Sequence, residues 1–156
     1  MKIFYYCYAG VHSSVIAGYI HLNKLPGDRA PMIREILDLP EFDNNRGRDF
    51  GIPCFLGKDS RQNDIYALGL WKDRALGLQT IIHLLAEGSY QTEWKFLNAL
   101  DHINWLTRLG GFLSQRLKLK FIGKNLAARG IQMSYFQLVK LVTKEKGHCE
   151  TEREQT

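Results

Sequence analysis

The chain has 156 residues, of which 45% are apolar and 24% are charged, and its formal net charge is +5. This length suits one ordinary domain and the composition is close to the globular average, which excludes two full domains, extensive disorder and a collagen-like chain. No apolar run approaches the roughly 18 residues of a membrane helix, so we expect no membrane partner.

Strand and helix patterns alternate in the first half of the chain. β-Forming residues stop at Ala9-Gly10, and apolar residues at helical spacing then run up to Pro26-Gly27. The predicted elements are a strand over 2–8, a helix over 13–25, a short helix after Pro31, an exposed loop over 41–51, and a hairpin with strands over 52–56 and 65–70.

The same alternation continues in the second half. Its predicted elements are a helix over 74–86, a strand over 94–100, a helix over 103–117, a weak strand around 121–122 or 126–128, and a helix over 133–143. Gly110-Gly111 predicts a kink, a break or close packing within the helix over 103–117. The polar, acidic residues 145–156 predict a disordered tail after a single domain of residues 1–144.

This order of elements predicts a three-layer α/β fold. Alternating strands and helices favour a mostly parallel sheet with helices on both faces, and the hairpin adds an antiparallel pair. In such a fold ligands bind at the carboxyl edge of the sheet, so the first strand-to-helix turn is the first place to look for a site.

That turn combines Cys7, Gly10, His12, Ser13 and Ser14. Glycine allows a positive φ and a close approach to a ligand, and the unpaired amides of the following helix attract phosphate. We therefore expect the glycine and the two serines to bind an anion. The histidine would donate a hydrogen bond or carry a proton, and the cysteine, if accessible beside the helix dipole, would be a reactive thiol.

Each of these residues also has a purely structural interpretation. Ser13 or Ser14 can be an ordinary helix N-cap, Cys7 a small buried side chain, and His12 a loop residue without function. Two phosphate motifs are excluded: no Gly-Lys pair precedes the serines, as a Walker A loop requires, and a serine stands six residues after Cys7, where a tyrosine-phosphatase loop has arginine. Cys54 and Cys149 form no Cys-x-x-Cys pair with it, which favours a reducing, cytoplasmic compartment without a zinc site.

Positive charge is concentrated late in the chain. Residues 102–144 contain eight Lys or Arg residues and no acid, a pattern that favours an anionic partner, although a solvated basic face gives the same pattern. Arg108 or Arg129 is a candidate charge clamp for an anion held at the first turn. The same segment permits nucleic-acid binding, without any of the known nucleic-acid-binding signatures.

Asp101 is the remaining candidate. It follows a predicted buried strand, where an aspartate in a phosphate site would hold magnesium or orient a water molecule. Alternatively, it caps a helix that begins at Ile103.

Several stretches of the sequence together resemble a known family. They are Tyr5-Tyr6-Cys7-Tyr8-Ala9-Gly10-Val11-His12-Ser13-Ser14, Ile20-His21-Leu22, Leu25-Pro26, the hairpin, Arg108-Leu109-Gly110-Gly111-Phe112-Leu113-Ser114 and Arg129-Gly130. The family is an uncharacterised bacterial domain of unknown function, found mostly in Gram-positive spore-formers. The resemblance implies the fold and a cytoplasmic setting, and it implies no activity, substrate or cofactor.

The sequence thus predicts a cytoplasmic domain that binds a phosphorylated small molecule or nucleotide at the first turn, whether or not it acts on the phosphate. His12, Asp101 and Cys7 are the candidate catalytic residues. Alternatives are a regulatory module that binds another protein and a nucleic-acid-binding module. Sequence alone leaves the oligomeric state open.

Overall fold

The fold is built on a four-stranded mixed sheet. The computed structural model describes residues 1–44, 50–88, 92–115 and 120–151. Its strands are β1 (Lys2–Cys7), β2 (Cys54–Lys58), β3 (Asp64–Gly69) and β4 (Trp94–Asn98), in the order β2-β3-β1-β4. β1 pairs in parallel with β3 and β4, and β2 pairs antiparallel with β3. The predicted mixed sheet with one antiparallel hairpin is confirmed.

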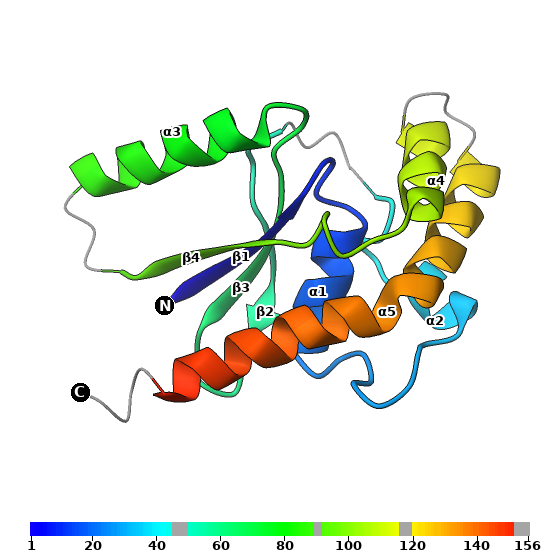
Figure 1. The fold of residues 1–156 in the computed structure, drawn as a ribbon, viewed down its shortest axis with the longest axis horizontal. Coiled ribbons are helices and arrows are strands. Elements are labelled where there is room, and N and C mark those ends of the chain that lie inside the picture. The colour runs from blue at the N-terminus through cyan, green and yellow to red at the C-terminus, as the bar shows by residue number, and fades with distance from the viewer. Residues whose placement is uncertain (45–49, 89–91, 116–119, 152–156) are drawn as a thin grey trace.

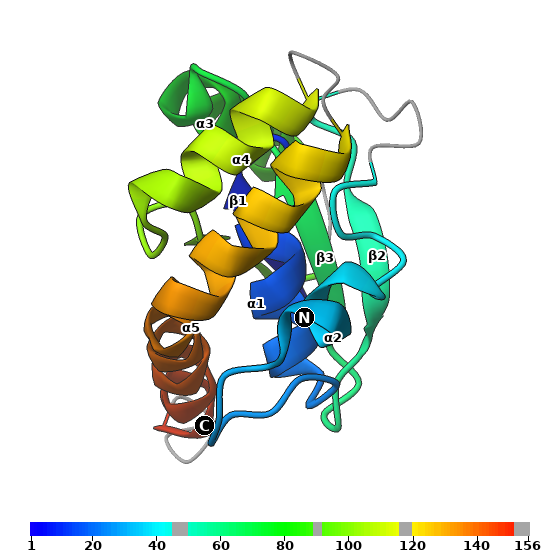
Figure 2. The same cartoon turned by 90° about the vertical axis from the view of Figure 1, so that its right-hand side faces the viewer.

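Helices cover both faces of this sheet, as predicted. They are α1 (Ser13–His21), α2 (Ile33–Leu37), α3 (Arg74–Glu87), α4 (Trp105–Gln115) and α5 (Lys120–Thr151). α3 lies on one face, and α1 and α5 lie on the other (Figure 1). In the perpendicular view α5 crosses α1, with α4 and α2 beside it (Figure 2).

The alternation of side chains along β1 explains the three layers. Ile3 and Tyr5 are fully buried in the core shared with α1 and α5, whereas Phe4 points to the opposite face. All nine residues of α1 are buried, because this helix is enclosed between the sheet and α5. The first helix is therefore held firmly, and its N-terminal end has a fixed position at the carboxyl edge of the sheet.

A row of aromatic rings crosses the face under α3. Phe4 stacks on Tyr66 of β3 at 4.8 Å between ring centroids and on Phe96 of β4 at 5.0 Å. From α3, Leu78 and Ile81 pack against this row. None of the residues of α3 is fully buried, so this helix contributes much less to the core than α1 does.

The prediction for the last third of the chain is wrong in two respects. Residues 120–128 are helical instead of forming a weak strand, and 145–151 continue the same helix instead of forming a disordered tail. The helix continues because Glu145 is buried and pairs with Lys95 at 2.8 Å. The rest of the expected tail, 152–156, lies outside the described residues, as does part of the expected loop, 45–49.

Glycines let α4 and α5 approach each other closely. A Cβ added at Gly110 would lie 2.3 Å from the backbone nitrogen of Ala127, and one at Gly130 would lie 2.4 Å from that of Thr107. Of the three interpretations of Gly110-Gly111, close packing is the one observed, since α4 runs through the pair.

We expect Gly130→Ala to lower the free energy of unfolding by about 1 to 2 kcal/mol, because overpacking against backbone atoms outweighs the gain in helix propensity. Gly147→Ala in the same helix is the matched control, since no atom lies within 4 Å of a Cβ at that position. It should stabilise the protein slightly. Urea denaturation of both variants measures the difference, and equal stabilities would contradict the packing argument.

Within the described residues, no helix combines the length and the apolar composition that crossing a bilayer requires.

Candidate functional site

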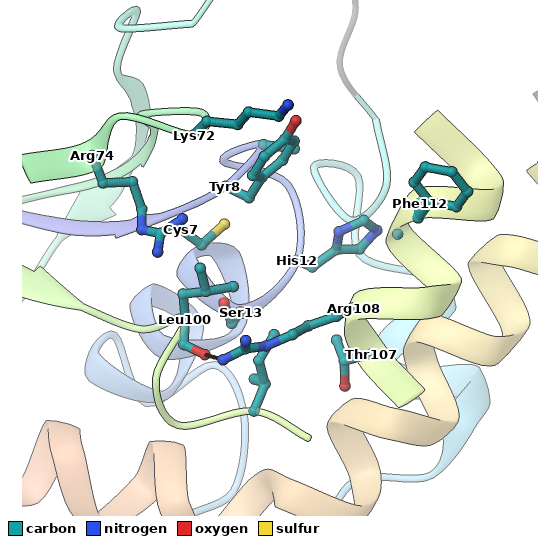
Figure 3. Close-up of a pocket in the computed structure, with 13 residues that line it drawn as sticks. Cys7, Tyr8, His12, Ser13, Lys72, Arg74, Leu100, Thr107, Arg108 and Phe112 are labelled. Atoms are coloured by element: carbon teal, nitrogen blue, oxygen red, sulfur yellow. Dashed lines mark hydrogen bonds between the residues drawn. The ribbon is translucent and has the colours of Figure 1, made fainter. Parts of the chain in front are cut away.

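A cavity of about 450 Å³ opens at the carboxyl edge of the sheet (Figure 3). Three parts of the chain line it: the β1–α1 turn, the segment between β3 and α3, and α4 with the residues that precede it. The lining residues are Cys7, Tyr8, Ala9, His12 and Ser13 from the first part, Lys72 and Arg74 from the second, and Leu100, Ile103, Thr107, Arg108, Gly111 and Phe112 from the third.

The β1–α1 turn is shaped by a close backbone contact. Gly10 has a φ of +74°, and a Cβ on it would lie 2.7 Å from the backbone nitrogen of Gly69. Beyond this contact, Leu70 and Trp71 donate backbone hydrogen bonds to the carbonyl oxygens of Cys7 and Tyr8. The pairing of β3 with β1 therefore continues past both strands and brings the basic residues after β3 to the edge of the cavity.

The start of α1 leaves several donors without acceptors. His12 occupies the N-cap position and its side chain makes no capping bond, so neither Ser13 nor Ser14 is the cap. The first helical bond is donated by Ile16, and within the described part of the chain the amides of residues 13–15 have no acceptor. The Ser13 hydroxyl is also fully buried without a hydrogen-bond partner, although it lines the cavity.

Cys7 lies at the end of β1 and is in contact with two polar groups. The amide of Gly10 donates a hydrogen bond to its Sγ at 3.2 Å, and the Ser14 Oγ lies 3.2 Å from the same sulfur. Gly10 and Ser14 thus support the cysteine and do not line the cavity themselves. Cys7 lines the cavity, although only 3% of its surface is exposed.

His12 is held by a partner that lies 31 residues further along the chain. Its Nε2 donates to a carboxylate oxygen of Asp43 at 2.8 Å, which leaves Nδ1 as the second nitrogen of the neutral ring. The ring packs edge-on against Phe42 and also contacts α4, since a Cβ at Gly111 would lie 3.2 Å from Nδ1. This carboxylate–histidine pair fixes the orientation of the ring at the cavity wall.

Three cations line the cavity, and no acidic side chain is among its described lining residues. The guanidinium of Arg108 donates to the carbonyl oxygen of Leu100 at 3.3 Å, and that of Arg74 donates to Trp71 O at 3.4 Å. In Figure 3, Arg108 extends from α4 across the cavity floor, while Lys72 and Arg74 approach from the other side. The cavity therefore has a positive potential that favours an anion.

Besides Gly10 and Ser14, two more predicted site residues, Asp101 and Arg129, do not line this cavity. Asp101 is exposed, and its carboxylate accepts a hydrogen bond from Asn98 at 2.7 Å. It does not cap the next helix either, because α4 begins at Trp105 and is capped by Asn104, which accepts from the backbone amide of Thr107. Arg129 is an exposed residue of α5. Among the described residues, no group of three or more His, Cys, Asp or Glu side chains is placed to hold a metal ion.

Sequence reasoning missed Lys72, Arg74 and Asp43. The two cations directly follow β3, and a basic residue after a strand is a usable signal once that strand is known to lie beside β1. The partner of His12 carried no local signal, because it belongs to an irregular loop.

A second polar cluster lies at the opposite end of α1. The Tyr5 hydroxyl is 2.7 Å from Nδ1 of His21, whose Nε2 is 3.2 Å from the carboxylate of Asp59. Burial lowers the pKa of His21, against the opposing effect of its bond to Asp59. Hydrogen bonds from Asn63 and from backbone amides hold the pKa of Asp59 low in spite of its burial. All these groups have protein partners, so we assign this cluster a structural role.

A model of a known protein family matches most of the chain. The model of a family described as "Protein of unknown function (DUF3189)" matches residues 2–147. No curated protein and no solved structure matches the chain.

Proposed function

The chain belongs to the DUF3189 family, whose description assigns no activity, and from its cavity we propose that it binds a phosphorylated small molecule or nucleotide at the β1–α1 turn. The observation that carries this proposal is the Ser13 hydroxyl, which is fully buried, lacks a partner and lines the cavity. An unpaired buried hydroxyl costs about 1 to 3 kcal/mol, so its presence calls for an acceptor from a ligand.

The surroundings of Ser13 fit a phosphate group. The unpaired amides of residues 13–15 and the positive end of α1 favour a negative charge. Arg108 adds a guanidinium that can bind two oxygens of one phosphate. The proposed setting is cytoplasmic, in keeping with the free thiols of Cys7 and Cys54. Magnesium beside Asp101 stays a prediction.

Calorimetric titration with inorganic phosphate and with adenosine monophosphate tests the proposal. Ser13→Ala and Arg108→Gln should each weaken phosphate binding about tenfold or more, the effect of losing one hydrogen bond to a charged group. Arg129→Gln is the matched control, because it removes an exposed arginine outside the cavity.

The stability of Ser13→Ala separates binding from folding. Since the hydroxyl has no partner in the protein, its removal should leave the melting temperature unchanged or raise it. Unchanged phosphate affinity in both cavity variants would contradict the proposal.

The outer face of α5 supports the alternative of a surface that binds another macromolecule. Met133 and Phe136 are 75% and 56% exposed there, and Lys140 and Lys144 are exposed as well. A protein partner would use the two apolar side chains. Nucleic-acid binding through the cations would weaken steeply with salt, and a heparin column eluted with a salt gradient checks that.

A further inference from the structure

We propose that Cys7 is the nucleophile of a phosphoryl-transfer reaction, and that the substrate is a phosphate monoester with an apolar, aromatic leaving group. This inference rests on the proposed function, because the same cavity must first bind the phosphate. It adds a bond-breaking step to binding.

The contacts of Cys7 suit a thiolate. Its sulfur accepts the Gly10 amide hydrogen and lies within hydrogen-bond distance of the Ser14 hydroxyl, both at 3.2 Å. It also lies beside the N-terminal end of α1, whose partial positive charge stabilises an anion. A cysteine that only filled space would need none of these donors.

A phosphoryl group has its own donors in the same cavity. The unpartnered Ser13 hydroxyl and the unpaired amides at the start of α1 are available to its oxygens. The view in Figure 3 shows the Ser13 hydroxyl between the Cys7 sulfur and the Arg108 guanidinium. Position 13 holds serine where a tyrosine-phosphatase loop has arginine, and here Arg108 of α4 provides the guanidinium from 95 residues further along the chain.

The reaction balances with the groups present. The Cys7 thiol gives its proton to Nδ1 of the neutral His12 ring, which becomes an imidazolium. The resulting thiolate attacks phosphorus, a P–S bond forms, and the P–O ester bond breaks. The leaving oxygen keeps the electron pair and takes a proton from the His12 imidazolium. A water molecule then attacks phosphorus and gives its proton to the neutral His12, the P–S bond breaks, and inorganic phosphate leaves with the thiolate restored.

The lining of the cavity indicates the leaving group. The aromatic ring of Tyr8 and the side chains of Leu100, Ile103 and Phe112 form apolar walls around the charged end. The Thr107 hydroxyl, a polar group on this wall, already donates to Asn104. A hydrocarbon or aromatic ring is therefore matched better than a sugar or a nucleobase with many hydrogen-bonding groups. The volume of about 450 Å³ admits a single-ring aryl phosphate.

Hydrolysis of p-nitrophenyl phosphate by the full chain tests the inference. We expect turnover in the wild type and a loss of roughly 10³-fold or more in Cys7→Ser and Cys7→Ala, as when the nucleophile of an enzyme is removed. Cys54→Ser is the matched control, because that thiol lies on β2 outside the cavity, and it should keep wild-type turnover. Acid quenching of the wild-type reaction followed by peptide mass spectrometry should find one phosphoryl group on the peptide that contains Cys7.

Calorimetry with inorganic phosphate separates the two proposals. If the wild type binds phosphate but shows neither turnover nor a phosphorylated Cys7, the assignment of Cys7 as the nucleophile is overturned and the proposed binding function stands. Turnover that persists in both Cys7 variants overturns it in the same way. If phosphate does not bind at all, both proposals fall. The trapped wild-type intermediate keeps the test independent of how well the variants fold.

Discussion

Replacing Gly10 by alanine should lower the free energy of unfolding by about 3 kcal/mol. The backbone φ of +74° costs an L-residue about 1 to 2 kcal/mol. In addition, the new Cβ would lie 2.7 Å from the backbone nitrogen of Gly69, where no flexible side chain can give way. Separating the two backbones adds an overpacking cost of about 1 to 3 kcal/mol.

Gly27→Ala is the matched control for this prediction. A Cβ at Gly27 would meet no atom within 4 Å, so its stability in urea should change by no more than about 0.5 kcal/mol. Phosphate affinity should fall in Gly10→Ala alone, because the turn that positions Cys7 and Ser13 is displaced. Equal stability of the two variants would show that the Gly10–Gly69 contact is not a constraint.

Replacing His21 by leucine should destabilise the protein by about 3 kcal/mol at pH 7. The change removes the acceptor of the Tyr5 hydroxyl and a donor to the Asp59 carboxylate, both in a buried setting. A buried hydrogen bond contributes about 0.5 to 1.5 kcal/mol, and one to a charged group contributes about 1.5 to 3 kcal/mol. His21→Gln, which keeps a donor and an acceptor, should lose less, and urea denaturation compares the two variants.

His21 should also make stability depend on pH. Burial lowers its pKa in the folded protein below the ordinary value of 6.5, so below that pH the unfolded chain binds more protons than the folded one. Stability therefore falls as the pH drops from 7 through 6.5 and approaches the folded pKa. The charged groups around His21 are Asp59 from the β2–β3 turn and Glu145 and Lys146 from α5.

Comparing the pH dependence of stability in the wild type and in His21→Gln isolates the contribution of His21. Denaturation of the wild type and of His21→Gln at pH 7, 6 and 5 should give a steeper decline for the wild type. Parallel curves would show that His21 does not have the lowered pKa that its burial implies.

Local signals sufficed for much of the fold and for the residues of the β1–α1 turn that line the candidate cavity. The turn from Cys7 to Ser14 lies within one strand and one helix, so the sequence pattern locates it directly. The N-cap was expected at Ser13 or Ser14, whereas His12 takes that position while its side chain is bound to Asp43. This partner lies in a loop, and no periodicity marks it.

The remaining errors come from non-local packing. Lys72 and Arg74 reach the cavity only because β3 pairs with β1, and strand order is not encoded in any short segment. The apolar residues of 120–128 fit both a strand and a helix. Burial of Ala127 and Ala128 against α4 and the rest of the core favours the helix.

The backbone bonds from Leu70 and Trp71 to the β1–α1 turn have a further effect on ligand choice. They hold the backbone before Lys72 in a fixed position relative to Cys7, so this wall of the cavity is rigid. The opposite wall, α4, packs mainly against α5. Relatives of this protein that bind larger or smaller ligands should therefore differ at the glycines that set the separation of α4 and α5. Their sheets should be alike.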